Sequence, residues 1–230
     1  MRKLSLRQRL NRIKNPALFR HFLPKKPVSR QFGCERGTAI DRYYIDRFLE
    51  QNSKHIQGDI LEVAETTYTQ MFTKKICSSK YLAFNPDPNP NAIVGDLMKP
   101  ETLPSGQFDC FICTQTFQYI EDIKKGIASV LQLLRPGGVF LGTMPGISQK
   151  STTAKDNWYD LWRFNQKGIE RNFIEMFGKN QVKTEVFGNV YVAAAFLYGL
   201  TLEDVPKKQL DLNDPDYEFL ITVFAQKKWS

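Results

Sequence analysis

The sequence contains few of the residues that build metal or redox sites. Its histidines are His21 and His55, and its cysteines are Cys34, Cys77, Cys110 and Cys113. Cys110 and Cys113 form a Cys-x-x-Cys pair, but they lie in the apolar run FDCFICTQ, where a strand would point them to opposite faces. Buried thiols in a reducing cytoplasm are therefore the favoured interpretation, and we expect no metal site.

Long apolar runs are also absent. No stretch of about 18 apolar residues occurs, which excludes a membrane-spanning helix, and the basic N-terminus lacks the apolar core and cleavage site of a signal peptide. We therefore expect a cytoplasmic protein. Its 230 residues, 42% of them hydrophobic, suffice for one α/β domain with a substantial core.

Acidic residues are missing from the first 30 positions, which hold ten Lys and Arg. The remaining chain has 22 bases against 24 acids, so nucleic-acid binding by the body is not indicated. Leu6, Leu10 and Ile13 recur at helical spacing in this basic extension, residues 1–30. Such a segment can contact anionic lipid at the inner membrane surface or an acidic partner; alternatively it is a solvated extension whose apolar residues pack on the body.

Glycine is absent from the turn after the first predicted strand. The run DILEVA (59–64) predicts that strand, and strands of this kind normally enter a glycine-rich turn that binds a cofactor through its backbone. Here the turn reads Ala64-Glu65-Thr66-Thr67. Ala64 adds only a methyl group, whereas the β-branched threonines resist a left-handed backbone but offer hydroxyls.

Helices and strands alternate along most of the chain, which favours one parallel sheet covered on both faces, without a second domain. The expected helices span 41–52, capped by Thr38 or Asp41, 68–76, 122–134, 165–178 and 190–200. The other expected strands span 81–85, 92–97, 107–115, 139–144, 181–188 and 217–228.

Ligands of such sheets bind beyond the carboxyl ends of the strands, where the strand order reverses. Asp87 stands 23 residues beyond Ala64, the spacing at which an acid binds ribose hydroxyls, although a turn role is the alternative. Asp96 is placed to accept from an adenine amino group, or else to cap the next turn. Thr114, Gln115 and Thr116 follow the fourth predicted strand.

Four stretches resemble the class I S-adenosylmethionine-dependent methyltransferases: GDILEVAE, AIVGDL, FDCFICTQTFQYIEDI and LLRPGGVFLGTMPG. The stretches RGTAIDRYYIDRFLE, WRFNQKGIERNF, GNVYVAAAFLYGL and DPDYEFLITVFAQK are similar to a bacterial group linked to glycosyltransferases in polysaccharide clusters. The resemblance covers residues 30–227. It implies a Rossmann-like, mostly parallel seven-stranded sheet with an antiparallel last strand, in a single methyltransferase-like domain over residues 31–230.

The resemblance also implies residue roles. Glu62 would lie near the methionine part of S-adenosylmethionine, Asp87 at the ribose, and Asp96 with Leu97 at the adenine. The complete expected cofactor set is Glu62, Ala64, Glu65, Thr66, Asp87, Asp96, Leu97, Thr114 and Gln115. The usual acid and glycine-x-glycine-x-glycine turn is not matched, but the polysaccharide-linked group has a similarly glycine-poor turn, which ETTYT fits.

The acceptor site is less defined. Aromatic side chains can stack on sugar rings, and arginines can bind a phosphate or carboxylate; the candidates are Arg36, Tyr43, Tyr119, Trp158, Trp162 and Arg163. Core packing is the alternative for each aromatic residue. Neither histidine is an attractive general base, which leaves carboxylates such as Asp41 or Glu121.

Three functions fit these observations. The first is O-methylation of a sugar during surface polysaccharide biosynthesis, with a small-molecule or glycan acceptor. The second is a catalytically inactive module that binds a glycosyltransferase, and contact with such an enzyme or with the membrane would involve residues 1–30. A nicotinamide-dependent oxidoreductase is the third; the missing glycine fingerprint and the run LLRPGGVFL count against it.

Overall fold

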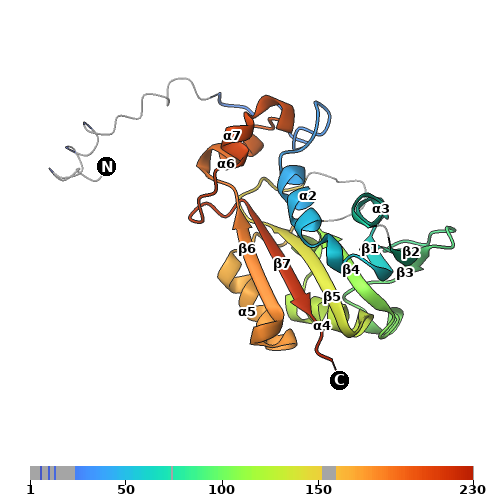
Figure 1. Ribbon diagram of the computed structural model, residues 1–230. Coiled ribbons are helices and arrows are strands. Elements are labelled where there is room, and N and C mark those ends of the chain that lie inside the picture. Colours follow the sequence, from blue (N-terminus) through green and yellow to red (C-terminus); the bar gives the residue numbers. More distant parts are fainter. Residues whose placement is uncertain are drawn as a thin grey trace.

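The computed structural model describes Leu6, Leu10, Ile13 and residues 24–73, 75–151 and 159–229. Within this part of the chain, seven strands form one sheet in the order β3-β2-β1-β4-β5-β7-β6 (Figure 1). The strands are β1 (Gly58–Val63), β2 (Ile76–Ala83), β3 (Ala92–Val94), β4 (Phe108–Thr114), β5 (Leu134–Pro145), β6 (Val182–Phe187) and β7 (Leu220–Gln226). β7 runs antiparallel to both neighbours, whereas the first five strands pair in parallel. The predicted fold class is therefore confirmed.

Helices cover both faces of the sheet. They are α2 (Asp41–Gln51), α3 (Thr67–Phe72), α4 (Ile123–Leu133), α5 (Gln166–Phe177), α6 (Val190–Leu197) and α7 (Lys207–Leu210). One buried cluster joins α2 and α6 to the sheet through Phe48 and Phe196, and the other joins α4 and α5 through Ile127 and Phe173. Because burial of apolar surface dominates folding, these two clusters fix the layers.

The two cysteines of β4 lie on opposite faces of the sheet, as predicted. Cys110 belongs to the α2 cluster and Cys113 to the α4 cluster, so they point to opposite faces. Burial raises the pKa of both thiols. Neither is a candidate nucleophile or metal ligand.

Several predicted boundaries shift in the structure. The helix expected over 68–76 ends at Phe72, and the strand expected over 81–85 occupies Ile76–Ala83. Asn165 caps α5 as predicted, because its Oδ1 accepts from the Gly168 N–H at 2.7 Å. The expected cap of α2 is wrong: Ile40 holds the N-cap position, and no side chain caps it.

The strand order reverses at β1, which pairs with β2 on one side and β4 on the other. A crevice forms at such a point, beyond the carboxyl ends of the strands. No helix among the described residues has the length and apolar character needed to cross a membrane.

Candidate active site

The glycine-free turn after β1 places a single residue in the left-handed region. Ala64 has a φ of 69°, whereas Thr66 has a φ of −115° and Thr67 already begins α3. The backbone strain of the turn is therefore confined to the residue with the smallest side chain, which answers how the chain turns here without glycine. The Ala64 N–H donates to the Leu82 carbonyl at 3.0 Å, which ties the turn to β2.

Glu62 fixes the start of α3. Its carboxylate is 3% exposed and accepts from the Tyr68 N–H at 3.2 Å, the Thr69 N–H at 3.0 Å and the Thr69 hydroxyl at 3.0 Å. Burial raises the pKa of Glu62, and these hydrogen bonds oppose the rise. Glu62 thus fixes the conformation of the turn, because its carboxylate accepts from N–H groups that have no partner within the helix.

An open cleft of about 690 Å³ lies beside this turn, at the carboxyl ends of β1 to β4. We call it the apolar cleft; its lining is Val63, Leu82, Phe84, Gly95, Asp96, Leu97, Met98, Lys99, Thr116, Tyr119, Ile120, Glu121, Tyr159 and Leu161. Two predicted cofactor residues, Asp96 and Leu97, line it. Apolar walls with a few polar groups at the rim suit a flat heterocycle such as adenine.

The predicted ribose ligand stands outside this lining. Asp87 follows β2, and its carboxylate accepts from the Tyr81 hydroxyl at 2.7 Å and the Asn89 N–H at 2.9 Å. These bonds lower the pKa of Asp87 and keep it ionised. Ribose binding by Asp87 stays a prediction, as do roles for Glu65, which is exposed, and Thr66, whose hydroxyl accepts from Gln70.

The end of β4 turns sharply between two cavities. Gln115 has a φ of 49°, and its backbone is held by the Thr143 carbonyl at 2.9 Å and by the Gln118 side-chain amide at 2.8 Å. The Thr116 hydroxyl donates to the Thr114 carbonyl at 3.0 Å. A strained backbone held by this many bonds is typical of a binding site.

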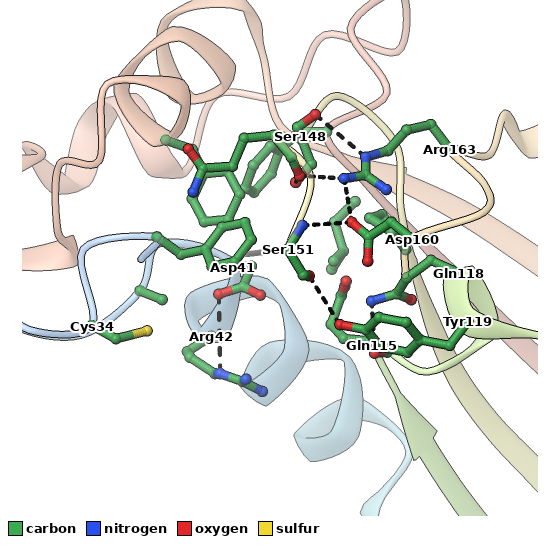
Figure 2. A pocket seen from close by; sticks show the side chains of 17 residues that line it. Cys34, Asp41, Arg42, Gln115, Gln118, Tyr119, Ser148, Ser151, Asp160 and Arg163 are labelled. Carbon is green, nitrogen blue, oxygen red and sulfur yellow. Dashed lines mark hydrogen bonds and ion pairs between the residues drawn. The ribbon is translucent and has the colours of Figure 1, made fainter. Parts of the chain in front are cut away.

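A second, smaller cavity of about 210 Å³ opens beyond Gln115 (Figure 2). We call it the polar cavity; its lining is Phe32, Cys34, Ala39, Asp41, Arg42, Gln115, Gln118, Tyr119, Pro145, Ser148, Gln149, Ser151, Asp160, Arg163, Phe196, Phe219 and Leu220. Tyr119 lines both this cavity and the apolar cleft, and its hydroxyl is 2.9 Å from the Ser151 hydroxyl. The two spaces therefore share a wall, as cofactor and acceptor sites must.

Three buried oxygens of the polar cavity have no hydrogen-bond donor among the described residues. They are Asp41 Oδ1, Gln118 Oε1 and Asp160 Oδ1. Leaving a buried acceptor unpaired costs about 1–3 kcal/mol. Three of them around one small space indicate a ligand that brings hydrogen-bond donors.

Asp41 faces the cavity because it is the first residue of α2 and does not cap it (Figure 2). Its side chain is 13% exposed, and Oδ1 lies 4.0 Å from Arg42 Nε. Burial raises the pKa of Asp41, and the Arg42 guanidinium opposes the rise. Arg42 in turn donates to the Tyr68 hydroxyl at 2.6 Å, which links the cavity to α3.

Asp160 and Arg163 form the opposite wall. Asp160 Oδ2 accepts from Arg163 Nη2 at 2.6 Å and from the Ser151 N–H at 2.7 Å, and the Asp160 side chain is only 4% exposed. Arg163 also donates to the carbonyls of Ser148, Gln149 and Trp162. Arg163 therefore connects Asp160 to the segment of Ser148 and Gln149 in this wall of the polar cavity.

The other predicted acceptor residues lie away from the polar cavity. Arg36 binds Asp204 and the Gly199 carbonyl, and the Tyr43 hydroxyl donates to Asp211 at 2.5 Å. Trp162 donates through Nε1 to the Ile120 carbonyl. Trp158 falls outside the described residues, so its predicted role has no structural counterpart here.

Most of the polar residues that line the polar cavity were not identified from the sequence. Asp41 was one of two carboxylates considered as a base, but Gln118, Ser151 and Asp160 were not singled out. Asp160 and Arg163 are three residues apart, the only local signal that the sequence offered for their ion pair.

Comparison with known proteins agrees with the geometry. Residues 49–142 match a family described as a methyltransferase domain. An S-adenosylmethionine-dependent methyltransferase from Mesorhizobium loti shares 15% identity at a TM-score of 0.53, over 82% of this chain and 98% of that one. A second, from Archaeoglobus fulgidus, shares 10% identity at a TM-score of 0.51, over 81% and 94% of the two chains.

The fold alone does not settle the reaction. The [4+2]-cyclase SpnF is similar to this chain as well, with 11% identity and a TM-score of 0.51 over 85% of this chain and 84% of that one. A search of curated proteins found no match. The methyltransferase domain matches residues 49–142, less than half of the chain, and these solved structures show the fold alone; together they support a methyltransferase activity.

Proposed function

We propose that the protein transfers a methyl group from S-adenosylmethionine to a hydroxyl of a sugar. The observation that carries the proposal is the set of three unpaired acceptor oxygens in the polar cavity, on Asp41, Gln118 and Asp160. Sugar hydroxyls are compact donors that can satisfy several acceptors within one small space. A role in surface polysaccharide synthesis rests on the sequence resemblance.

The charge of the cavity favours a neutral acceptor over an ammonium group. Asp41 and Asp160 bring two negative charges to the cavity, and Arg42 and Arg163, their neighbours on the two opposite walls, bring two positive charges. The cavity therefore has no excess charge to attract an ion, while its oxygens still require donors. A polyhydroxylated ligand meets both conditions.

The apolar cleft fits the cofactor. Leu82 and Leu97 line the cleft and would hold the adenine, Asp96 would accept from its amino group, and Tyr119 lines both this cleft and the polar cavity. S-adenosylmethionine, when bound, supplies an electrophilic methyl group on a sulfonium.

Asp41 is proposed as the general base. Its unpaired Oδ1 faces the polar cavity, and its raised pKa makes it a better proton acceptor than an exposed carboxylate. Asp41 Oδ1 would accept the proton of the acceptor hydroxyl, and S-adenosylmethionine, when bound, would supply the methyl group to that oxygen and leave as the neutral thioether. Gln118 and Asp160 Oδ1 orient the acceptor by accepting from its other hydroxyls.

Radiolabelled methyl transfer to a panel of nucleotide sugars and polysaccharide repeats tests the proposal. Wild-type protein should label at least one sugar, and Asp41→Asn should lose about 100-fold or more in kcat while it still binds the cofactor. Glu121→Gln provides the matched control, because Glu121 is an exposed carboxylate that does not line the polar cavity.

Labelling of amines but of no sugar would contradict the acceptor class. Cofactor binding without labelling of any acceptor, including glycan extracts, would favour the inactive module that binds a glycosyltransferase.

A further inference from the structure

Helix α6 exposes an apolar face to solvent. Val190 is 56% exposed, Tyr191 44% and Leu197 40%, and Ala194 is exposed between them. These positions share one side of an α-helix, while Val192, Ala193, Ala195 and Phe196 on the other side are buried in the core.

The helix is held rigidly in this orientation. The Asn189 side chain caps it by accepting from the Val192 N–H at 3.0 Å, and its amide donates to the carbonyls of Gln209 and Leu212 at 2.8 and 2.7 Å. The exposed face is therefore a fixed feature of the fold and cannot be buried by rotating the helix.

The basic N-terminal extension joins the body at the end of this helix. The Val28 N–H donates to the Tyr198 carbonyl at 2.8 Å, next to the last residue of α6, and Val28 itself is 55% exposed. Exposed Lys25, Lys26 and Arg30 flank Val28. On the other side, α7 packs against α6 and exposes Lys207 and Lys208 (Figure 1).

Three described residues near the start of the extension are helical and exposed. Leu6 is 74% exposed, Leu10 49% and Ile13 75%, at a spacing of four and three residues that places them on one side of a helix. They do not cover the α6 face. The first 30 residues hold ten Lys and Arg and no acid.

Acidic groups lie mainly at the other end of α6 or are already paired. The Asp214 N–H bonds to the Gly188 carbonyl, before the helix starts. Asp204 accepts from Thr201 and Arg36, and Glu203 accepts from Thr38. The end of α6 that carries Leu197 is therefore bordered mainly by bases.

We propose that the exposed face of α6 and the described bases around it, Lys25, Lys26, Arg30, Lys207 and Lys208, form one surface that docks on an anionic lipid bilayer. Apolar side chains of α6 enter the interface, and the flanking lysines and arginines contact lipid phosphates. This combination of an apolar stripe with surrounding bases is what interfacial membrane binding requires, and each base near an anionic surface adds to the affinity. Docking here would hold the enzyme next to lipid-linked acceptors, but the inference does not depend on the proposed acceptor.

Co-sedimentation of the full chain with vesicles tests the proposal. Phosphatidylcholine vesicles with about a third phosphatidylglycerol should bind the protein, and neutral vesicles should bind it at least about tenfold more weakly. Raising salt to about 0.5 M should weaken binding to the anionic vesicles. The combined variant Val190→Gln and Leu197→Gln should lose about tenfold in affinity, and Lys207→Gln with Lys208→Gln should lose several-fold.

Ile76→Gln is the matched control, because Ile76 is 43% exposed at the start of β2, outside this surface. It should bind vesicles like the wild type, and circular dichroism should show every variant folded. Equal binding by the α6 variant and the control would overturn the proposal. Absence of vesicle binding, with a dimer in sedimentation velocity that the α6 substitutions dissociate, would assign the face to a second copy instead.

Discussion

Glu62 and Thr69 are joined by two hydrogen bonds to one carboxylate oxygen: Oε2 accepts from both the backbone N–H and the hydroxyl of Thr69, each at 3.0 Å. The first residues of a helix have N–H groups without intrahelical partners, and here an acid from the neighbouring strand supplies the acceptor. These hydrogen bonds fix the position of α3 relative to β1 and the conformation of the turn between them.

Glu62→Ala should therefore unfold more easily and lose cofactor binding. It leaves two N–H groups and a hydroxyl without their acceptor, so we expect a loss of about 3 kcal/mol in the free energy of unfolding. Urea denaturation measures the stability, and calorimetric titration with S-adenosylmethionine measures the binding. Glu65→Ala is the control, because Glu65 is exposed; equal stability losses in the two variants would contradict the role of Glu62.

Ala64→Gly should stabilise the protein. A left-handed backbone costs an alanine about 1–2 kcal/mol, and glycine removes that strain but adds freedom to the unfolded chain. We expect a net gain of about 0.5 kcal/mol by urea denaturation, with cofactor affinity retained. Ala64→Val should lose about 2 kcal/mol, because a β-branched residue resists a φ of 69°. A glycine variant less stable than the valine variant would show that the turn is not strained.

Asp41→Asn should make the protein more stable at neutral pH while it abolishes methyl transfer. Burial raises the pKa of Asp41 in the folded state, so the folded protein holds the proton more tightly than the unfolded chain. Ionised Asp41 therefore costs stability above its unfolded pKa, and the cost increases as pH rises through the folded pKa. Thermal unfolding should show the largest advantage of the Asn variant at about pH 8 and none well below 3.8, the ordinary value of an Asp.

The raised pKa of Asp41 also predicts how the methyl-transfer activity depends on pH. Because the base must be ionised, activity should fall as pH drops through the raised pKa of Asp41. An Asn variant with wild-type kcat at every pH would exclude Asp41 as the base.

Arg163→Met should be strongly destabilising, because it leaves Asp160 buried without its counter-charge. Removal of one partner of a buried ion pair costs about 3–5 kcal/mol. Adding Asp160→Asn to Arg163→Met should recover part of this loss, and a double-mutant cycle measured by urea denaturation gives the coupling energy. If the double variant loses as much unfolding free energy as the two single variants together, Asp160 and Arg163 do not interact, and the account of the ion pair is wrong.

The alternation of apolar runs and helical stripes predicted a parallel sheet covered on both faces, since each buried strand and each amphipathic helix has its own period. The seven strands and the antiparallel last strand were implied by the family resemblance. Boundaries were less predictable: Cys77 to Lys80 are polar enough to hide the first half of β2, which pairs along β1 nonetheless. Pairing with β1 therefore determines where β2 begins, because the local sequence there has little preference for a strand.

The candidate site, too, could be predicted from the sequence only in part. Asp96 and Leu97 follow directly from a strand end, so their place in the apolar cleft could be predicted. The polar cavity brings together the start of α2, the turn after β4 and the segment around Asp160, which lie far apart in the chain. Only the folded structure shows that Asp41 faces Gln118 and Asp160 across one space.

Calorimetric titration of the wild-type chain with S-adenosylhomocysteine tests the central claim most directly, because it asks whether a turn without glycine still supports a cofactor site. We expect one site with a Kd of about 1–100 μM, weakened about tenfold or more in Asp96→Ala through loss of a hydrogen bond to the adenine. Glu101→Ala, an exposed acid five residues further on, should bind like the wild type. No heat of binding from a folded protein, with either S-adenosylhomocysteine or S-adenosylmethionine, would contradict the account.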